Sequence, residues 1–431
     1  MLALESFIHR DSFAEIVSRW VVNRPIPGDV ARLKNIVNFN SYIVRIWLER
    51  FARELFTKLH GEPPEDFRAT QKGQLKDFIV QNPPYTNDRI QALFTRYQKF
   101  PEDYYRETPF DGRIFFLRQN GTPRYVGSTR IKRFRRIAEK GSRRIVEYMF
   151  DRIRTSAQAF ADERAKSLGI PRHKLVTPQE QMVEEFLHAE RRLLKYIRQG
   201  TIQQEFQPLS IPDVAGLKVV AEGNQFERLV QILEASPDCA ILEQEHHTGK
   251  YNAINLKVAH RIPREMLSQN PPNADQRRFL ISRGFDSRTI LDQYSEFMNT
   301  AEDQVLLEII VSTYQNSLES EIGQSMHEDR VLQQRANRDY STHLATNVRY
   351  LMNYLFSLCL SPTNEEMSNV PIRLWIKYMP DTIDRLVRAL YDVPVDGALE
   401  FSSRSVSGEF AMYTSSPIET IDSGPRTIIE P

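Results

Sequence analysis

The chain has 431 residues, of which 41% are hydrophobic and 26% are charged. This composition excludes collagen, long disordered acidic or basic proteins and small disulfide scaffolds. Its 57 Lys and Arg against 56 Asp and Glu give a formal net charge of +1, so the overall charge identifies no class of partner. At roughly 100 to 200 residues per domain, the length predicts two or three compact units, each with its own core.

Cysteine usage and the first residues bear on the cellular compartment. Cys239 and Cys359 lie in apolar surroundings without CxxC or Cys/His spacing, which argues against a zinc site and against a disulfide framework. The N-terminal MLALESFIHRDSF has no apolar signal-peptide core, and no run of about 18 apolar residues follows it. We therefore expect a soluble, cytoplasmic protein without a membrane partner, and these features leave open a homo-oligomer.

The first part of the chain, residues 1–110, has the apolar spacing of helices. Trp47, Phe51 and Leu55, for example, recur at four-residue steps. The pattern changes over residues 111–184, where GRIFFL, a turn and RYVG predict a β-hairpin that leads into a basic helix. We expect a helical N-terminal region followed by this hairpin and its helical continuation.

The clearest succession of elements lies within residues 185–335. A strand (GLKVV), a helix (FERLVQILEAS) and two strands (AILEQE and YNAINLKV) come first, and a further strand (QVLLEIIVS) comes after an insertion at about 261–303. Residues 336–396 again have helical spacing, and the Ser-rich residues 397–431 predict a tail with little order. The expected fold class is α+β, with a mixed β-sheet flanked by N- and C-terminal helical regions.

Two carboxylates in this segment can carry chemistry. Asp213 opens one predicted strand and Glu308 lies within another, so neighbouring strands would bring the two side chains together. Mg²⁺ favours a few carboxylate oxygens and takes its other ligands from water and phosphates. The pair therefore predicts a Mg²⁺ site for phosphoryl or pyrophosphoryl transfer. The alternative is that both are solvated surface groups, as acidic residues at strand ends usually are.

The order of these elements resembles the synthetase domain of the RelA/SpoT family, which transfers pyrophosphate from ATP to a nucleotide 3′-hydroxyl. The resemblance rests on DVAGLKVV, GKYNAINLKV and LLEIIVSTYQNSLESEIGQSMHE. It implies that Asp213 is a catalytic metal ligand and that Glu308 assists the metal or the attacking hydroxyl. It also implies that Tyr251 stacks on the acceptor base, although a strand tyrosine can equally pack under a loop.

Several positions of the family's motifs are altered. Lys218 stands where the family usually has arginine, Lys250 where a glycine precedes the tyrosine, and Asn255 where a histidine is expected. The resemblance implies that these three residues bind substrate. Two segments could correspond to the family's basic ATP-binding segment. RRLLKYIR lies at the expected location, whereas RIKRFRRIAEKG lies far upstream but has a more similar residue pattern. The changes leave open a degenerate protein that binds nucleotide or RNA without catalysis.

Residues 112–150 resemble, over a shorter stretch, the opening of GIY-YIG nucleases. In that family two strand tyrosines, a helix arginine and a later glutamate hydrolyse a phosphodiester with one metal ion. The corresponding residues would be Phe115 and Tyr125 on the strands, Arg135 or Arg136 on the helix, and Glu147. Phe115 lacks the hydroxyl of the first tyrosine. The resemblance implies an endonuclease as an alternative function.

The basic helix is the strongest local charge signal. From Arg124 to Arg154 there are eleven basic and three acidic residues, which is more one-sided than a solvated helix face requires. The phosphates of a nucleoside triphosphate or of a nucleic-acid backbone explain this imbalance better. The residues expected to contact phosphate are Arg133, Arg136, Lys140 and Arg144.

Together these patterns predict Mg²⁺-dependent pyrophosphoryl transfer from ATP to an acceptor nucleotide or to an RNA 3′-hydroxyl. The partners would be ATP and that acceptor. The alternatives are a GIY-YIG-like endonuclease, a catalytically degenerate nucleotide- or RNA-binding protein, and a purely interaction role.

Overall fold

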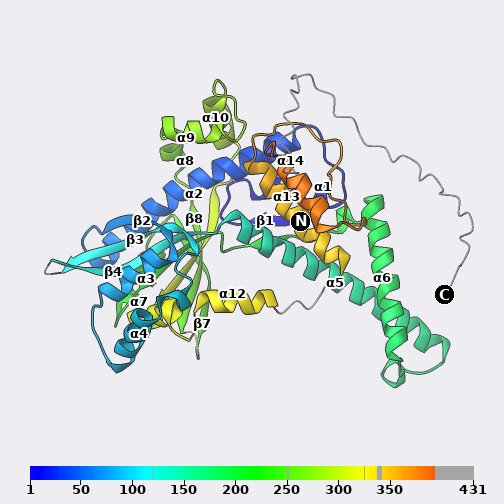
Figure 1. The fold of residues 1–431 in the computed structure, drawn as a ribbon, viewed down its shortest axis with the longest axis horizontal. Coiled ribbons are helices and arrows are strands. Elements are labelled where there is room, and N and C mark those ends of the chain that lie inside the picture. The colour runs from blue at the N-terminus through cyan, green and yellow to red at the C-terminus, as the bar shows by residue number, and fades with distance from the viewer. Residues whose placement is uncertain (120, 250–251, 325, 337–341, 394–431) are drawn as a thin grey trace, which may run out of the picture. The chain divides into compact units, whose positions relative to one another are not determined.

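The computed structural model describes residues 1–119, 121–249, 252–324, 326–336 and 342–393 (Figure 1). It combines helices with a mixed sheet, which confirms the α+β class. The strands are β1 Leu2–Leu4, β2 Glu65–Gln71, β3 Pro109–Gln119, β4 Thr122–Ile131, β5 Leu209–Ile211, β6 Ala215–Val220, β7 Cys239–His247, β8 Ala253–Arg261 and β9 Gln304–Ser312. The helices are α1 Arg10–Val21, α2 Asp29–His60, α3 Lys72–Gln81, α4 Asp88–Lys99, α5 Phe134–Ser167, α6 Gln179–Gln199, α7 Gln225–Glu234, α8 Arg264–Gln269, α9 Ala274–Ile281, α10 Ile290–Asn299, α11 Tyr314–Ile322, α12 His327–Ala336, α13 His343–Leu360 and α14 Pro380–Ala389.

The elements predicted within residues 185–335 occur in the expected order. Seven strands form one sheet in the order β2-β3-β4-β6-β9-β8-β7. Strands β6 and β9 are parallel neighbours, with Gly216 opposite Glu308, and β8 and β7 continue the sheet in antiparallel pairs. The insertion between β8 and β9 contains three helices, α8, α9 and α10.

The β3–β4 hairpin belongs to this same sheet, so residues 111–184 do not form a separate region. Strand β4 pairs antiparallel with β6, from Gly127 opposite Val219 to Ile131 opposite Ala215. Successive side chains of β4 point to opposite faces. Val126 contributes to the core that includes α2 and α7, whereas Tyr125 contributes to the core that includes α3, α4 and α11. Residues 1–393 accordingly form one compact unit.

The N-terminal region is not purely helical, and that prediction was wrong for β1 and β2. Leu2 of β1 lies opposite Leu209 of β5 in a short parallel pair, while β2 pairs with β3 at the edge of the large sheet. A strand of three residues has too little alternation to detect. In β2 only Ala69 is buried, so the hydrophobic pattern of this edge strand is weak.

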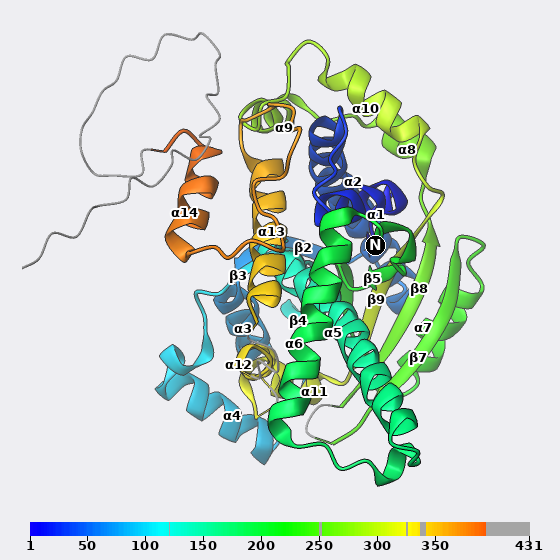
Figure 2. The same cartoon turned by 90° about the vertical axis from the view of Figure 1, so that its right-hand side faces the viewer.

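Long helices extend the core beyond the sheet. Helix α5 follows β4 after a connection of two residues and packs against α6 and α13 (Figure 2). In the insertion, the rings of Tyr294 and Phe297 pack on Phe39 of α2. The C-terminal helical region contains α13 and α14, and the predicted tail 397–431 lies outside the described residues. Among the residues described here, no helix has both the length and the apolar character that a membrane span requires.

Gly127 allows the close approach of β4 to both β6 and α2. A Cβ at this position would overlap the carbonyl oxygen of Lys218 and the ring of Phe56. We predict that Gly127→Ala lowers the free energy of unfolding by about 1 to 3 kcal/mol, the usual cost of overpacking. In Gly216→Ala, the new Cβ would come no closer than 3.4 Å to another group, the carbonyl oxygen of Glu308. Urea unfolding followed by circular dichroism should therefore show a much smaller loss for this control, and equal losses would contradict the packing argument.

Candidate phosphate-binding site

Asp213 lies between β5 and β6, beside the junction of β4 and α5. The Lys132 amide donates to the Val214 carbonyl at 2.8 Å, which continues the β4–β6 pairing past the end of the strands. The Lys132 ammonium donates to the Asp213 carbonyl at 2.8 Å. Lys132, between β4 and α5, and Lys140, in the second turn of α5, both pair with the Asp213 carboxylate. The sheet pairing therefore brings two cations onto one carboxylate.

This arrangement shifts the pKa of Asp213 and of Lys132. Burial by itself would raise the pKa of Asp213, but Lys132 and Lys140 outweigh burial and hold it well below its usual value. Burial lowers the pKa of the Lys132 ammonium, and Asp213 opposes that shift. Asp213 is thus an anion at neutral pH whose charge is already compensated by the protein.

Glu308 reaches the same place from β9. It lies opposite Gly216 of β6 and Lys257 of β8 in the sheet. The Asn255 amide nitrogen donates to Glu308 Oε1 at 3.4 Å, and the Asn255 side-chain oxygen is buried with no hydrogen-bond partner in the described part of the chain. Among the described residues Glu308 forms no ion pair. Asp213 and Glu308 thus differ, because Asp213 is paired with lysines, whereas Glu308 has no cationic partner in the described part of the chain.

Two cavities meet at Asp213 and Glu308. We call the first, of about 520 Å³, the hairpin cavity. Its cations are Lys72, Arg130, Lys132, Arg133, Arg136, Lys140, Lys218, Arg330 and Arg335, and its carboxylates are Asp111, Asp213, Glu308 and Glu328. We call the second, of about 820 Å³, the helix cavity. Its cations are Arg135, Arg136, Lys140, Arg143, Arg144, Arg335 and Arg349, and its carboxylates are Glu139, Glu147, Asp213 and Glu308.

Both cavities are strongly basic although the chain as a whole is nearly neutral. The hairpin cavity has nine Lys and Arg against four Asp and Glu, and the whole chain has a net charge of +1. Arg130 and Arg133 are half-buried in it and form no ion pair among the described residues. Burial, followed by the charge of Arg136, lowers the pKa of Arg133. Half-buried cations without a carboxylate partner favour an anionic ligand such as phosphate.

The structure brings together eight of the ten residues predicted for the site. Asp213, Glu308, Lys218, Asn255, Arg133, Arg136, Lys140 and Arg144 all line one or both cavities. The helix residues divide between them: Arg133 lines the hairpin cavity, Arg144 the helix cavity, and Arg136 and Lys140 both. The remaining two, Lys250 and Tyr251, lie outside the described residues.

Sequence reasoning did not single out Arg130 or Lys132 as site residues. Their signal was the segment RIKRFRRIAEKG, residues 130–141, which lines both cavities. The competing segment RRLLKYIR, residues 191–198, lies on α6 and lines neither of them. Residues 191–198 are nearer to Asp213 along the chain, but residues 130–141 line the cavities with Asp213.

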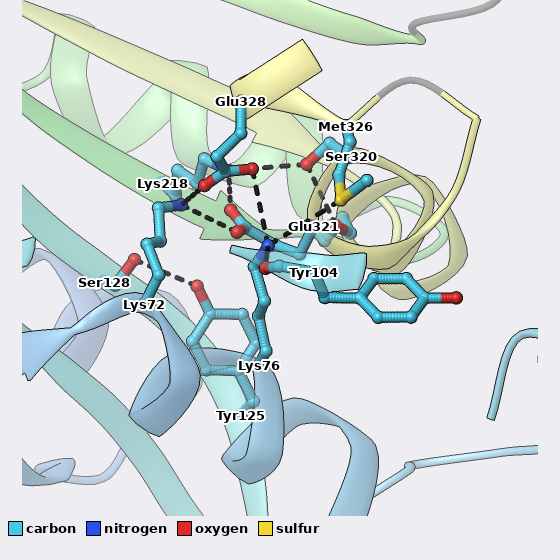
Figure 3. Close-up of polar contacts among 11 residues, drawn as sticks. Lys72, Lys76, Tyr104, Tyr125, Ser128, Lys218, Ser320, Glu321, Met326 and Glu328 are labelled. Atoms are coloured by element: carbon cyan, nitrogen blue, oxygen red, sulfur yellow. Dashed lines mark hydrogen bonds and ion pairs between the residues drawn. The ribbon is translucent and has the colours of Figure 1, made fainter. Parts of the chain in front are cut away.

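A buried ion network (Figure 3) contributes Lys72, Lys218 and Glu328 to one wall of the hairpin cavity. Glu321 of α11 accepts from Lys218 of β6 at 2.6 Å and from Lys72 of α3 at 2.7 Å. Lys76, whose side chain is fully buried, donates to the Tyr104 carbonyl at 2.7 Å and lies 3.4 Å from the Glu328 carboxylate of α12. Burial by itself would raise the pKa of Glu321, but Lys218 and Lys72 outweigh it and hold it well below its usual value.

The residues present fit Mg²⁺ only in company with phosphates. Within the described ranges, no group of three or more His, Cys, Asp or Glu is placed to hold a metal ion. Two carboxylates, Asp213 and Glu308, are enough for Mg²⁺ when substrate phosphates and water supply the other ligands. Because two ammonium groups already compensate Asp213, a metal would have to bring the negative charge of phosphates with it.

The structure does not bring together the residues that the nuclease alternative requires. Phe115 and Tyr125 are both fully buried, and they belong to the cores on opposite faces of the sheet. The Tyr125 hydroxyl donates to Ser128 at 3.0 Å, and burial raises the pKa of Tyr125. Glu147 pairs with Arg143 one turn earlier on α5. The hairpin thus has a packing role.

Comparison of the chain with protein-family models, with curated proteins and with solved structures gives no significant match.

Asp213→Asn tests the compensated carboxylate. Removing its charge leaves the buried Lys132 unpaired, and we expect a loss of about 3 kcal/mol in the free energy of unfolding at pH 7. This loss lies at the low end of the stability cost of breaking a buried ion pair, because Lys140 is 40% exposed and its charge is screened. The contribution is full above the pKa of unfolded aspartate, about 3.9, and is lost as pH falls through the lowered pKa of the folded state.

Chemical denaturation of wild type and variant should therefore give the full difference at about pH 6 and a shrinking one below about pH 4. Asp238→Asn is the matched control, since Asp238 is 51% exposed and lies 3.9 Å from Arg261. A difference between wild type and Asp213→Asn that does not change with pH would rule out the ion-pair explanation.

Glu321→Gln tests the buried ion network. The substitution leaves Lys72 and Lys218 without their shared carboxylate, and removal of one partner from a buried pair costs about 3 to 5 kcal/mol. Glu319→Gln, on the same helix, breaks a pair with the 45% exposed Arg89 and should cost less than about 1 kcal/mol. Thermal and urea unfolding measure both variants. If Glu321→Gln is as stable as Glu319→Gln, the network does not stabilise this wall.

Proposed function

We propose that the protein transfers a pyrophosphoryl group from ATP to the hydroxyl of a nucleotide or of an RNA 3′ end. One observation carries the proposal: a cavity with nine Lys and Arg side chains meets two carboxylates, Asp213 just before β6 and Glu308 on the neighbouring strand β9. A concentration of half-buried cations suits a triphosphate, and the carboxylates suit the chemistry at its centre. The resemblance to the RelA/SpoT synthetase domain supports this same pair.

The roles follow from the positions. Arg130, Arg133 and Arg136 would bind the ATP phosphates in the hairpin cavity. Lys132 and Lys140 would bind the same phosphates, and they orient Asp213 through their ion pairs. Mg²⁺ held by Asp213, Glu308 and the phosphates would neutralise charge and align the transferred group for in-line attack.

Glu308 is the residue that we assign to the attacking hydroxyl. Its carboxylate has no cationic partner among the described residues, it lines both cavities, and it can accept the proton of the hydroxyl as the new P–O bond forms and AMP leaves. Asn255 would hold Glu308 in place through its amide. The resemblance alone assigns Tyr251 and Lys250 to the acceptor.

Catalytically silent binding of nucleotide or RNA is the second candidate. It is favoured by the two ammonium groups on Asp213 and by the replaced family residues, Lys218 and Asn255 among them. Binding of ATP without turnover would support this candidate over transfer.

The test is transfer of label from γ-³²P-ATP. Incubation of the full chain with Mg²⁺ and with GDP, GTP, ADP or bulk RNA should produce AMP and label one acceptor. Glu308→Gln should lower kcat by about 100-fold or more, as loss of a general base does, with ATP affinity nearly unchanged. Glu243→Gln, on exposed β7 and outside both cavities, should keep full activity. ATP binding with no AMP from any acceptor would reject transfer, and full activity of Glu308→Gln would reject its role.

A further inference from the structure

The helix cavity is larger than the hairpin cavity and shares only part of its wall. Arg136, Lys140, Asp213, Glu308 and Arg335 line both cavities. Beyond this wall, the helix cavity extends between α5 and α13, two helices that pack on each other. A triphosphate bound among the cations of the hairpin cavity would leave this second space for another ligand.

The cations of the helix cavity are only partly compensated by protein. Glu139 pairs with Arg135, Arg136 and Arg335, and Glu147 pairs with Arg143. Arg144 and Arg349 form no ion pair among the described residues, and Arg349 donates only to the Thr346 hydroxyl, at 3.0 Å. These two guanidinium groups come from facing helices and line one cavity. Arg144 is exposed and Arg349 is half-buried, so both guanidinium groups are open to an anionic ligand that enters the cavity.

The described lining of the helix cavity contains no aromatic side chain. It therefore offers no ring on which a base could stack, and stacking is a main source of base binding in single-strand sites. Arginine and lysine contact phosphate without reading sequence. The chemistry of this cavity recognises a phosphate backbone rather than a nucleobase.

We infer that the helix cavity binds the phosphate backbone of a single-stranded nucleic acid, whose 3′ end lies at the shared wall beside Glu308. From Arg136 to Arg144 the axis of α5 rises by about 12 Å, which matches three or four phosphates of a stacked strand at roughly 3.4 Å each. A mononucleotide acceptor carries its phosphates in one short group and lacks the successive backbone phosphates that a strand would place along that length. The placement of the 3′ end rests on the proposed function; the binding of the backbone does not.

The experiment measures binding of fluorescein-labelled 12-nucleotide RNA and DNA by anisotropy between 50 mM and 300 mM salt. In the variant Arg144→Ala/Arg349→Ala we expect roughly a 10-fold or greater loss of affinity at 50 mM salt. The salt slope should fall by about 1.4, that is about 0.7 for each lost phosphate contact. Arg144→Lys/Arg349→Lys should keep most of the affinity, since it retains both charges.

The control Arg191→Ala/Arg198→Ala removes two exposed charges of α6, outside both cavities, and should leave strand binding unchanged. ATP affinity, measured by calorimetry, should be the same in all variants. If the wild type does not bind either 12-mer, or if Arg144→Ala/Arg349→Ala binds as tightly as wild type, the inference is overturned.

Transfer assays separate this inference from the proposed function. Label from γ-³²P-ATP on the RNA or DNA 12-mer, lost when its 3′-hydroxyl is blocked, supports both. Strand binding that depends on Arg144 and Arg349 without any transfer supports the backbone site and rejects the proposed function. Transfer to GDP or GTP with no strand binding rejects the backbone site and leaves the proposed function intact.

Discussion

The antiparallel pairing of β4 with β6 is the constraint on which the site depends. It joins residues 127–131 to residues 215–219 and so places the first turns of α5 against Asp213. Backbone hydrogen bonds of a central sheet tolerate little displacement, because a slip of one residue would turn every side chain to the other face. The positions of Lys132 and Lys140 are therefore set by the core and not by the charges that they carry.

Charge is distributed unevenly around Asp213 and the start of α5. The chain has a formal net charge of only +1. The two cavities, which share one wall, are nevertheless lined by more cations than carboxylates. Like charges held close together cost free energy unless an anion compensates them. Asp213 and Glu139 compensate some of them, while Arg130, Arg133, Arg144 and Arg349 have no ion-pair partner among the described residues. A ligand rich in phosphate would remove this cost, which links the stability of the site to its occupancy.

The buried ion network stabilises the structure around the hairpin cavity. The network connects α3 and β6 with the consecutive helices α11 and α12, which lie far from both along the chain, through Lys72, Lys76, Lys218, Glu321 and Glu328. Charges removed from water are stable only when each has a partner in good geometry, so the network permits one relative position of these elements. Glu321 serves Lys72 and Lys218 together. The wall of the hairpin cavity is thereby held by charge as well as by apolar packing.

The sequence by itself determined the succession of elements from β6 to β9, because alternating and helical periodicities are properties of neighbouring residues. It also determined the residue types that suit phosphate, including Asp213, Glu308 and the arginines of α5. Only the tertiary structure decided that the hairpin joins this sheet, that β2 closes its edge, and that residues 130–141 rather than 191–198 face Asp213. Pairing between strands that are distant in the sequence depends on the free energy of packing the whole core. A local sequence pattern does not contain that information.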